Sequence, residues 1–165
     1  MGVISAIGNS VAENRMALTV GRCGIQNNLD LFPTKYSGVL PFGQISVSTA
    51  SLLNNFKIDE PGVTRTTLLA LHAFNEAIQD GKLSLSEISS FDTALVGAST
   101  VGGMCLTDEL YADANKNTNG SPYTSSYDCA SVTMYLQRRY KMNGIINTIN
   151  TACSSSANLS PISIY

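Results

Sequence analysis

Apolar residues recur at helical spacing in the middle of the chain. Leu68, Leu71, Phe74 and Ile78 follow one another at intervals of three or four residues. This interval places them on one face of an α-helix. Gly81 follows the stripe, and glycine is the residue most often found just past a helix end. The pattern therefore predicts an amphipathic helix that ends at Gly81.

Two more helices are predicted on either side of this one. Ser10 begins the first, with Glu13 three residues later in the spacing of a capping box, and Gly21 ends it. The other runs over about 128–140 and is ended by Gly144. The apolar face of that later helix consists of Val132, Tyr135, Leu136 and Tyr140.

Short apolar runs between the helices predict strands. These runs occupy residues 3–8, 44–48, 92–99 and 145–150. A glycine-containing loop, 100–104, follows the third run, and the polar stretch 107–126 is expected to be partly exposed. Strands that alternate with helices indicate an α/β fold built in layers.

Composition narrows the class of protein. The chain has 165 residues, of which 44% are hydrophobic and 13% charged, and its net charge is −2. This is enough for one domain with a core, and it argues against disorder. The weakly acidic balance predicts neither a nucleic-acid partner nor an anionic membrane partner. The N-terminus lacks the pattern of a signal peptide, so we expect a cytoplasmic protein.

Cysteine and histidine are sparse. The four cysteines are Cys23, Cys105, Cys129 and Cys153, none of them in a C-x-x-C pair, and His72 is the single histidine. A zinc site needs a cluster of such ligands, so no metal site is predicted. We expect free thiols in a reducing compartment and a structural role for the first three cysteines. His72 lies beside the apolar stripe and is expected to face solvent or to pack locally.

The segment around Cys153 has the composition of a nucleophile turn. The predicted strand 145–150 runs directly into "TACSSSAN", where small residues permit a tight turn and the serines can begin a helix. The positive end of that helix would favour the thiolate form of Cys153, and nearby backbone N–H groups could stabilise an oxyanion. From spacing alone, Cys153 is either such a nucleophile or a buried structural thiol.

"NTACSSSAN" resembles the nucleophile motif of the β-ketoacyl-acyl-carrier-protein synthases, condensing enzymes of the thiolase superfamily. Three earlier segments are similar to the family in the same order: "GVISAIGNSVAENRMAL", "TRTTLLALHAFNEAI" and "DTALVGASTVGGM". The resemblance covers residues 2 to about 158. It implies an α/β fold corresponding to part of the N-terminal half of the thiolase-like fold, with layered αβα architecture.

The resemblance also implies site residues and partners. Cys153 matches the nucleophile, and its own backbone N–H would form one arm of the oxyanion hole. Val101, with Gly102 and Gly103, matches the loop that borders the acyl pocket, although simple loop packing is an equal alternative for Val101. No cofactor is implied, because acyl groups arrive on the phosphopantetheine of an acyl carrier protein. The strand 145–150 would pair two subunits of a homodimer or of a ketosynthase pair.

The implied reaction is decarboxylative condensation of an acyl thioester with malonyl-acyl carrier protein, in fatty-acid or polyketide and pigment synthesis. The family's decarboxylation groups belong to a C-terminal half that these residues do not include, and His72 cannot replace them. We therefore interpret 1–158 as an incomplete N-terminal synthase domain and 159–165 as a divergent tail, in which Pro161 would break the helix. A truncated gene product, a frame shift near 159 or an incomplete gene model would produce this sequence. We expect the isolated chain to be inactive, and the alternative function is a non-catalytic remnant or partner subunit.

Overall fold

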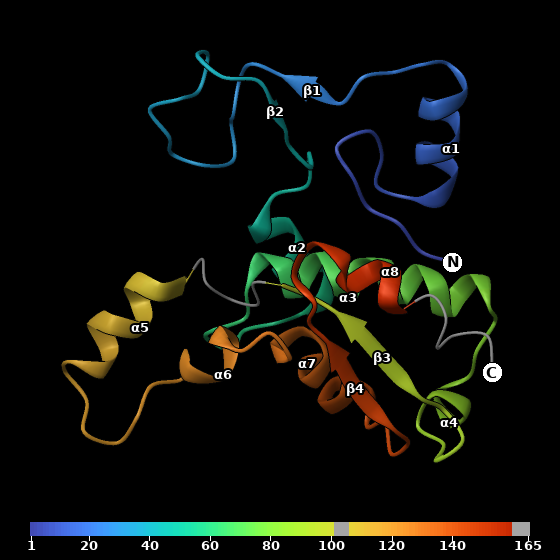
Figure 1. The fold of residues 1–165 in the computed structure, drawn as a ribbon, viewed down its shortest axis with the longest axis vertical. Coiled ribbons are helices and arrows are strands. Elements are labelled where there is room, and N and C mark those ends of the chain that lie inside the picture. Colours follow the sequence, from blue (N-terminus) through green and yellow to red (C-terminus); the bar gives the residue numbers. More distant parts are fainter. Residues whose placement is uncertain (101–105, 160–165) are drawn as a thin grey trace. The chain divides into compact units, whose positions relative to one another are not determined.

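The computed structural model describes residues 1–100 and 106–159 (Figure 1). The chain divides into two compact units. The first unit consists of Met1–Ile58 and Leu71–Lys82, and the second of Asp59–Ala70 and the residues from Leu83 onward.

Helices and short strands alternate along the described chain. In order they are α1 (Val11–Thr19), β1 (Ile25–Gln26), β2 (Phe42–Gly43), α2 (Thr49–Phe56), α3 (Arg65–Asp80), α4 (Leu85–Ile88), β3 (Leu95–Ala98), α5 (Thr107–Ala114), α6 (Thr124–Tyr127), α7 (Ser131–Tyr140), β4 (Ile146–Ile149), the 3₁₀ turn η2 (Ala152–Ser154) and α8 (Ser155–Leu159). The protein is therefore of mixed α/β type, as the sequence predicts.

Helix α1 begins where its capping signal predicts. The Ser10 hydroxyl accepts a hydrogen bond from the backbone N–H of Glu13 at 3.2 Å, which satisfies one unpaired donor of the first turn. The Glu13 carboxylate reaches back to the N–H of Asn9 at 2.7 Å, one residue before the cap. The two side chains together fix the start of this helix.

The predicted strand over 3–8 is wrong. This segment contains a single antiparallel bridge between Ser5 and Gly8, in which the N–H of Ser5 donates to the Gly8 carbonyl at 2.8 Å. The chain turns back on itself too tightly here for a strand to extend. The apolar run therefore forms a turn that leads into α1.

The predicted strand over 44–48 is also wrong. The antiparallel pair in this part of the chain is β1 with β2, two residues each. Ser48 instead caps α2, because its hydroxyl accepts from the N–H of Ser51 at 3.1 Å. The sequence did not predict α2, although Leu52, Leu53 and Phe56 lie on one face of it, because the helix is only eight residues long and its stripe is correspondingly short.

Helix α3 confirms the strongest sequence prediction. It runs from Arg65 to Asp80, directly before Gly81, and Leu68 and Leu71 of its apolar stripe are fully buried. The hydroxyl of Thr64 accepts from the N–H of Thr67 at 3.1 Å at the start of the helix. Burial of the two leucines supplies the main hydrophobic stabilisation of this helix.

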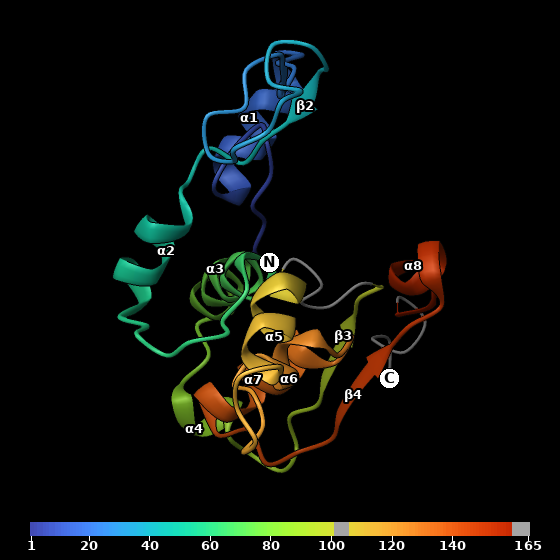
Figure 2. The same ribbon diagram turned by 90° about the vertical axis from the view of Figure 1, so that its left-hand side faces the viewer.

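Strands β3 and β4 confirm the predicted runs 92–99 and 145–150 and form a parallel pair. Leu95 pairs with Ile146, and the register continues to Ala98 opposite Ile149. Figure 2 shows α7 on one side of this pair and α8 on the other, where β4 ends. Because the two strands are parallel, their carboxyl ends lie at the same edge of the sheet.

Helix α7 lies within the predicted helix 128–140 and ends at Tyr140 as predicted, but Gly144 is not the residue that terminates it. Its last turn closes at Lys141, which takes the left-handed conformation with φ of 51°. Gly144, the predicted stop, is required for another reason: a Cβ at this position would lie 2.0 Å from the backbone oxygen of Thr93. This close approach brings the start of β4 against the start of β3.

The polar stretch 107–126 contains two helices that the sequence did not predict. Helix α5 buries none of its residues and α6 buries Ser126, so neither carries an apolar stripe. Asp108 and Glu109 lie in the first turn of α5, where negative charge stabilises the helix dipole.

Candidate functional site

Cys153 lies in a turn between a strand and a helix. Strand β4 ends at Ile149, and Cys153 is the middle residue of the 3₁₀ turn that joins this strand to α8. Its side chain is exposed and its thiol is free. The exposure argues against the alternative of a buried structural thiol.

Ala152 gives this turn its direction. Its φ is 51°, in the left-handed region that an alanine side chain disfavours by roughly 1–2 kcal/mol. Such a conformation persists when the surrounding structure fixes it. The residue directly before Cys153 is therefore the point at which the chain reverses out of β4.

The polar residues of the motif hold the turn together. Ser155 is buried, and its hydroxyl donates to the carbonyl of Ala152 at 2.7 Å while accepting from the N–H of Thr151 at 3.0 Å. The Ser154 hydroxyl donates to the Thr151 carbonyl at 2.8 Å. Asn158 donates from its side chain to the Thr151 hydroxyl at 2.7 Å. The serines that follow Cys153 therefore stabilise the first turn of the helix.

The backbone N–H of Cys153 has no acceptor within residues 1–100 and 106–159. It belongs to the first turn of a helical segment, where N–H groups lack intrahelical partners. A donor in this position, next to the thiol, suits the negative oxygen that develops when sulfur attacks a carbonyl group.

The loop after β3 reaches the same turn. The Thr100 hydroxyl donates to the Ala152 carbonyl at 2.9 Å. The predicted acyl-pocket residues Val101, Gly102 and Gly103 follow immediately, but they lie outside the described residues. Their assignment stays a prediction.

Cys129 and Asn150 are neighbours of the turn that the sequence analysis missed. The Asn150 amide donates to the Cys129 sulfur at 3.0 Å, and the Cys129 thiol donates to the Thr100 carbonyl at 3.3 Å. No local spacing pattern connects these residues, because they come from three distant segments. Cys129 is half-buried, and its sulfur is hydrogen-bonded to polar groups. A cysteine of the core instead packs against apolar side chains.

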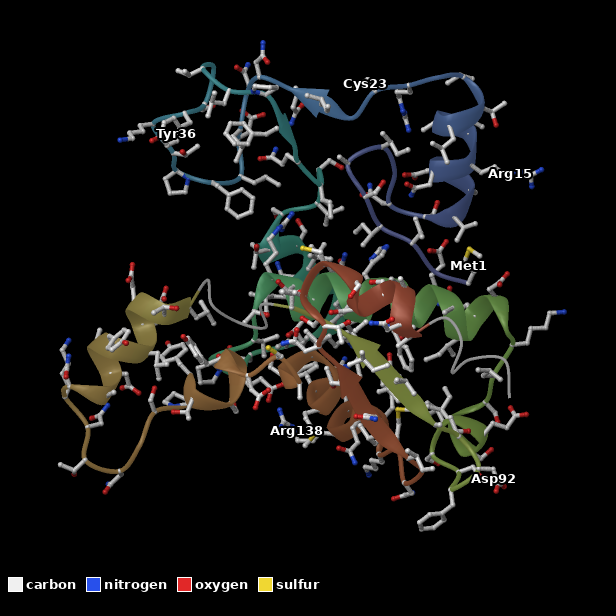
Figure 3. The ribbon with its side chains drawn as sticks, in the orientation of Figure 1. Met1, Arg15, Cys23, Tyr36, Asp92 and Arg138 are labelled. Carbon is white, nitrogen blue, oxygen red and sulfur yellow. The ribbon has the colours of Figure 1, made fainter. Side chains whose placement is uncertain are left out.

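The remaining cysteines are not part of this turn. Cys105 is outside the described residues. Cys23 lies on the segment that enters β1 in the first unit (Figure 3), where it is exposed. Its sulfur accepts from the N–H of Ile25 at 3.4 Å, so the structural role expected for Cys23 is a local contact and not burial.

His72 packs locally, as expected. Its Nε2 donates to the carbonyl of Asn9 at 2.7 Å, and its ring meets the edge of Phe56 with the centroids 6.4 Å apart. In the part of the chain that the structure describes, no three metal-binding side chains gather at one place. Among the helices described, none has the length and apolar character needed to cross a membrane.

Two known proteins are similar to this chain in sequence. The chain is 27% identical over 164 residues to 3-oxoacyl-[acyl-carrier-protein] synthase 1 of Escherichia coli strain K12, and equally to the protein of the same name from Escherichia coli O6:H1. The alignments cover 95% of this chain and 39% of each relative. The profile of the family described as "Beta-ketoacyl synthase, N-terminal domain" matches residues 1–160. The chain therefore belongs to the β-ketoacyl synthase family, of which it carries the N-terminal domain.

Proposed function

We propose that this chain carries the nucleophile of a β-ketoacyl synthase and that Cys153 accepts the acyl group. The observation that carries the proposal is the placement of Cys153: an exposed thiol between the left-handed Ala152 and the first turn of α8. Its own backbone N–H would donate to the oxygen of an attacked carbonyl group. The family to which the chain belongs supports the same assignment.

The acyl-transfer step balances without a cofactor. The Cys153 sulfur attacks the carbonyl carbon of a thioester, and a new carbon–sulfur bond forms as the carbonyl oxygen becomes negative. The bond to the carrier's sulfur then breaks, and the carrier leaves as a thiol with the proton that Cys153 loses. The product is an acyl group bound to Cys153.

Condensation would follow in the complete protein. The relatives are named as 3-oxoacyl-[acyl-carrier-protein] synthases, which supports an acyl carrier protein as the partner. The second substrate that the family resemblance implies is a malonyl thioester. Loss of carbon dioxide from that thioester would give the carbanion that attacks the acyl group. The groups for this step would lie in the other part of such a protein, since the chain spans 39% of the relatives' length.

The loop after β3 is the proposed border of the acyl pocket. Val101, Gly102 and Gly103 follow Thr100 directly, and Thr100 is hydrogen-bonded to the turn that carries Cys153. The parallel strands β3 and β4, with α7 and α8, support the view that the chain adopts part of a layered thiolase-like fold.

Strand β4 is the proposed contact between two subunits. Within the described residues, β3 is the one strand that pairs with it, so its second edge carries backbone groups that another strand can pair with. We expect a homodimer, or a pair with a related ketosynthase chain. The N–H groups of Leu95 and Ser99 bond the carbonyls of Ile145 and Ile149, so alternate residues of β4 face β3 and Ile146 faces the second edge. Sedimentation of the chain and of an Ile146→Pro variant tests the contact, because proline removes the donor of Ile146 from that edge. If the wild type sediments as a monomer, with the same mass as the variant, the contact is contradicted.

Acyl transfer to Cys153 tests the function directly. The chain is incubated with hexanoyl-coenzyme A, and each cysteine is followed by peptide mass spectrometry. We expect hexanoylation at Cys153 that hydroxylamine removes, unchanged in Cys23→Ala and absent in Cys153→Ala. If Cys153 reacts no faster than Cys23, the chain is the non-catalytic remnant or partner subunit, and the proposal is wrong.

A further inference from the structure

Four residues around the nucleophile turn form a closed ring of hydrogen bonds. The side chain of Asn150 bonds in two directions: its oxygen accepts from the N–H of Ala152 at 3.2 Å, and its amide donates to the Cys129 sulfur at 3.0 Å. Cys129 donates to the Thr100 carbonyl at 3.3 Å, and the Thr100 hydroxyl donates to the Ala152 carbonyl at 2.9 Å. We call these four residues the Asn150 ring.

The Asn150 ring joins three separate segments. Thr100 follows β3, Cys129 precedes α7, and Asn150 and Ala152 follow β4. Both polar groups of Ala152 are engaged, its N–H by Asn150 and its carbonyl by Thr100. These bonds oppose the intrinsic preference of an alanine to leave the left-handed region.

We propose that Asn150 is a positioning residue for Cys153, an inference that rests on the proposed acyl transfer. Asn150 does not touch the reacting atoms. It holds Ala152 at φ of 51°, and this angle sets the direction of the next peptide N–H and of the Cys153 thiol. Both must face the same carbonyl group, the N–H toward its oxygen and the sulfur toward its carbon.

The chemistry of the ring requires an amide at position 150. An amide offers an acceptor to Ala152 and a donor to Cys129, whose thiol is already directed at Thr100. A carboxylate offers acceptors alone, so Asn150→Asp keeps the bond to Ala152 and loses the one to Cys129. Serine at 129 still accepts and donates, whereas alanine does neither.

Two reactions of Cys153 separate positioning from simple exposure. Alkylation by iodoacetamide needs an accessible thiol, whereas transfer from hexanoyl-coenzyme A also needs the oriented N–H. The rate of each reaction at Cys153 is measured by peptide mass spectrometry in the full chain. For Asn150→Ala we expect the maximal acylation rate to fall about tenfold. The half-saturating thioester concentration and the alkylation rate should stay within about twofold.

Conservative variants complete the test. Asn150→Asp and Cys129→Ala should fall between wild type and Asn150→Ala, and Cys129→Ser should restore the wild-type rate. The matched control is Asn147→Ala, since the Asn147 side chain accepts from the neighbouring Thr148 N–H and has no part in the ring. If Asn150→Ala does not fold, the acylation and alkylation rates of Asn150→Asp are compared with those of the wild type instead.

The outcomes distinguish the two proposals. If wild-type Cys153 is acylated no faster than Cys23, the proposed function fails and the positioning role fails with it. If the wild type is acylated but Asn150→Ala or Asn150→Asp is acylated equally well, the positioning role alone is overturned. Equal losses in alkylation and acylation also overturn it, because they indicate a collapsed turn.

Discussion

Gly97 of β3 and Thr133 of α7 lie in direct contact. A Cβ on Gly97 would come 2.1 Å from the Thr133 hydroxyl oxygen. The same hydroxyl accepts a hydrogen bond at 2.9 Å from Thr148, which is the partner of Gly97 in the β3–β4 register. The helix therefore approaches the parallel pair where one strand has no side chain and the other supplies a donor.

Gly97→Ala should destabilise the protein by about 1–3 kcal/mol, because the added methyl group overlaps a buried side chain. Adding Thr133→Ala should recover part of the loss, since the overlapping atom is then removed. Denaturant unfolding of the single and double variants measures the coupling. Gly43→Ala is the control, because its Cβ would lie 3.6 Å from Ala6, at an ordinary contact distance. Additive effects of the two substitutions would contradict the contact.

Glu76 should be a main stabilising residue of the first unit. Its two carboxylate oxygens accept from the backbone N–H groups of Val3 at 2.9 Å and Val11 at 2.7 Å. Glu76→Ala leaves both donors without this charged acceptor and should lower the free energy of unfolding by about 2 kcal/mol. Thermal unfolding measures the loss. Gln79→Ala, at an exposed position of the same helix, should change it by less than about 0.5 kcal/mol.

Tyr135 should make the protein less stable in alkali. Burial, and then the negative charge of Glu60, raise the pKa of Tyr135 from 10.0 to about 12. Between these pH values the phenol of the unfolded chain has lost its proton while that of the folded chain keeps it. The unfolded state then binds fewer protons, so stability falls as the pH rises through this window.

The Tyr135→Phe variant isolates this effect. Its free energy of unfolding should decrease less steeply between pH 10 and 12 than that of the wild type. Denaturant titrations at a series of pH values compare the two slopes. Identical slopes would show that Tyr135 has the same proton affinity in both states.

The cysteines should differ in their accessibility to alkylating reagents. Cys23 and Cys153 are exposed, whereas Cys129 is half-buried and its sulfur is hydrogen-bonded within the Asn150 ring. In the native chain we expect iodoacetamide to label the first two several-fold faster than Cys129. Peptide mass spectrometry resolves the sites, and labelling in denaturant should remove the difference. Equal native rates would contradict the ring.

Local sequence determined the elements that carry a repeated signal. The apolar spacing of Leu68 and Leu71 specified α3, the Ser10 cap specified the start of α1, and two compact apolar runs specified β3 and β4. Helices α2 and α5 have eight residues each and bury one residue and none, so their apolar pattern is too short to give the repeated signal of α3. The turn at Cys153 could be predicted because strand, small residues and helix start are contiguous around it, whereas its role as a nucleophile is implied by the resemblance of "NTACSSSAN" and stays a proposal.

Tertiary structure decided what surrounds Cys153. Thr100 bonds Ala152, which lies 52 residues later in the chain, and Cys129 bonds Asn150, which lies 21 residues later. No local sequence pattern relates segments that are so far apart. The parallel pairing of β3 with β4 brings the ends of both strands to one edge, and α7 approaches them over Gly97. The sequence alone determines that a thiol follows β4. The hydrogen bonds that hold its turn exist because the fold assembles three segments there.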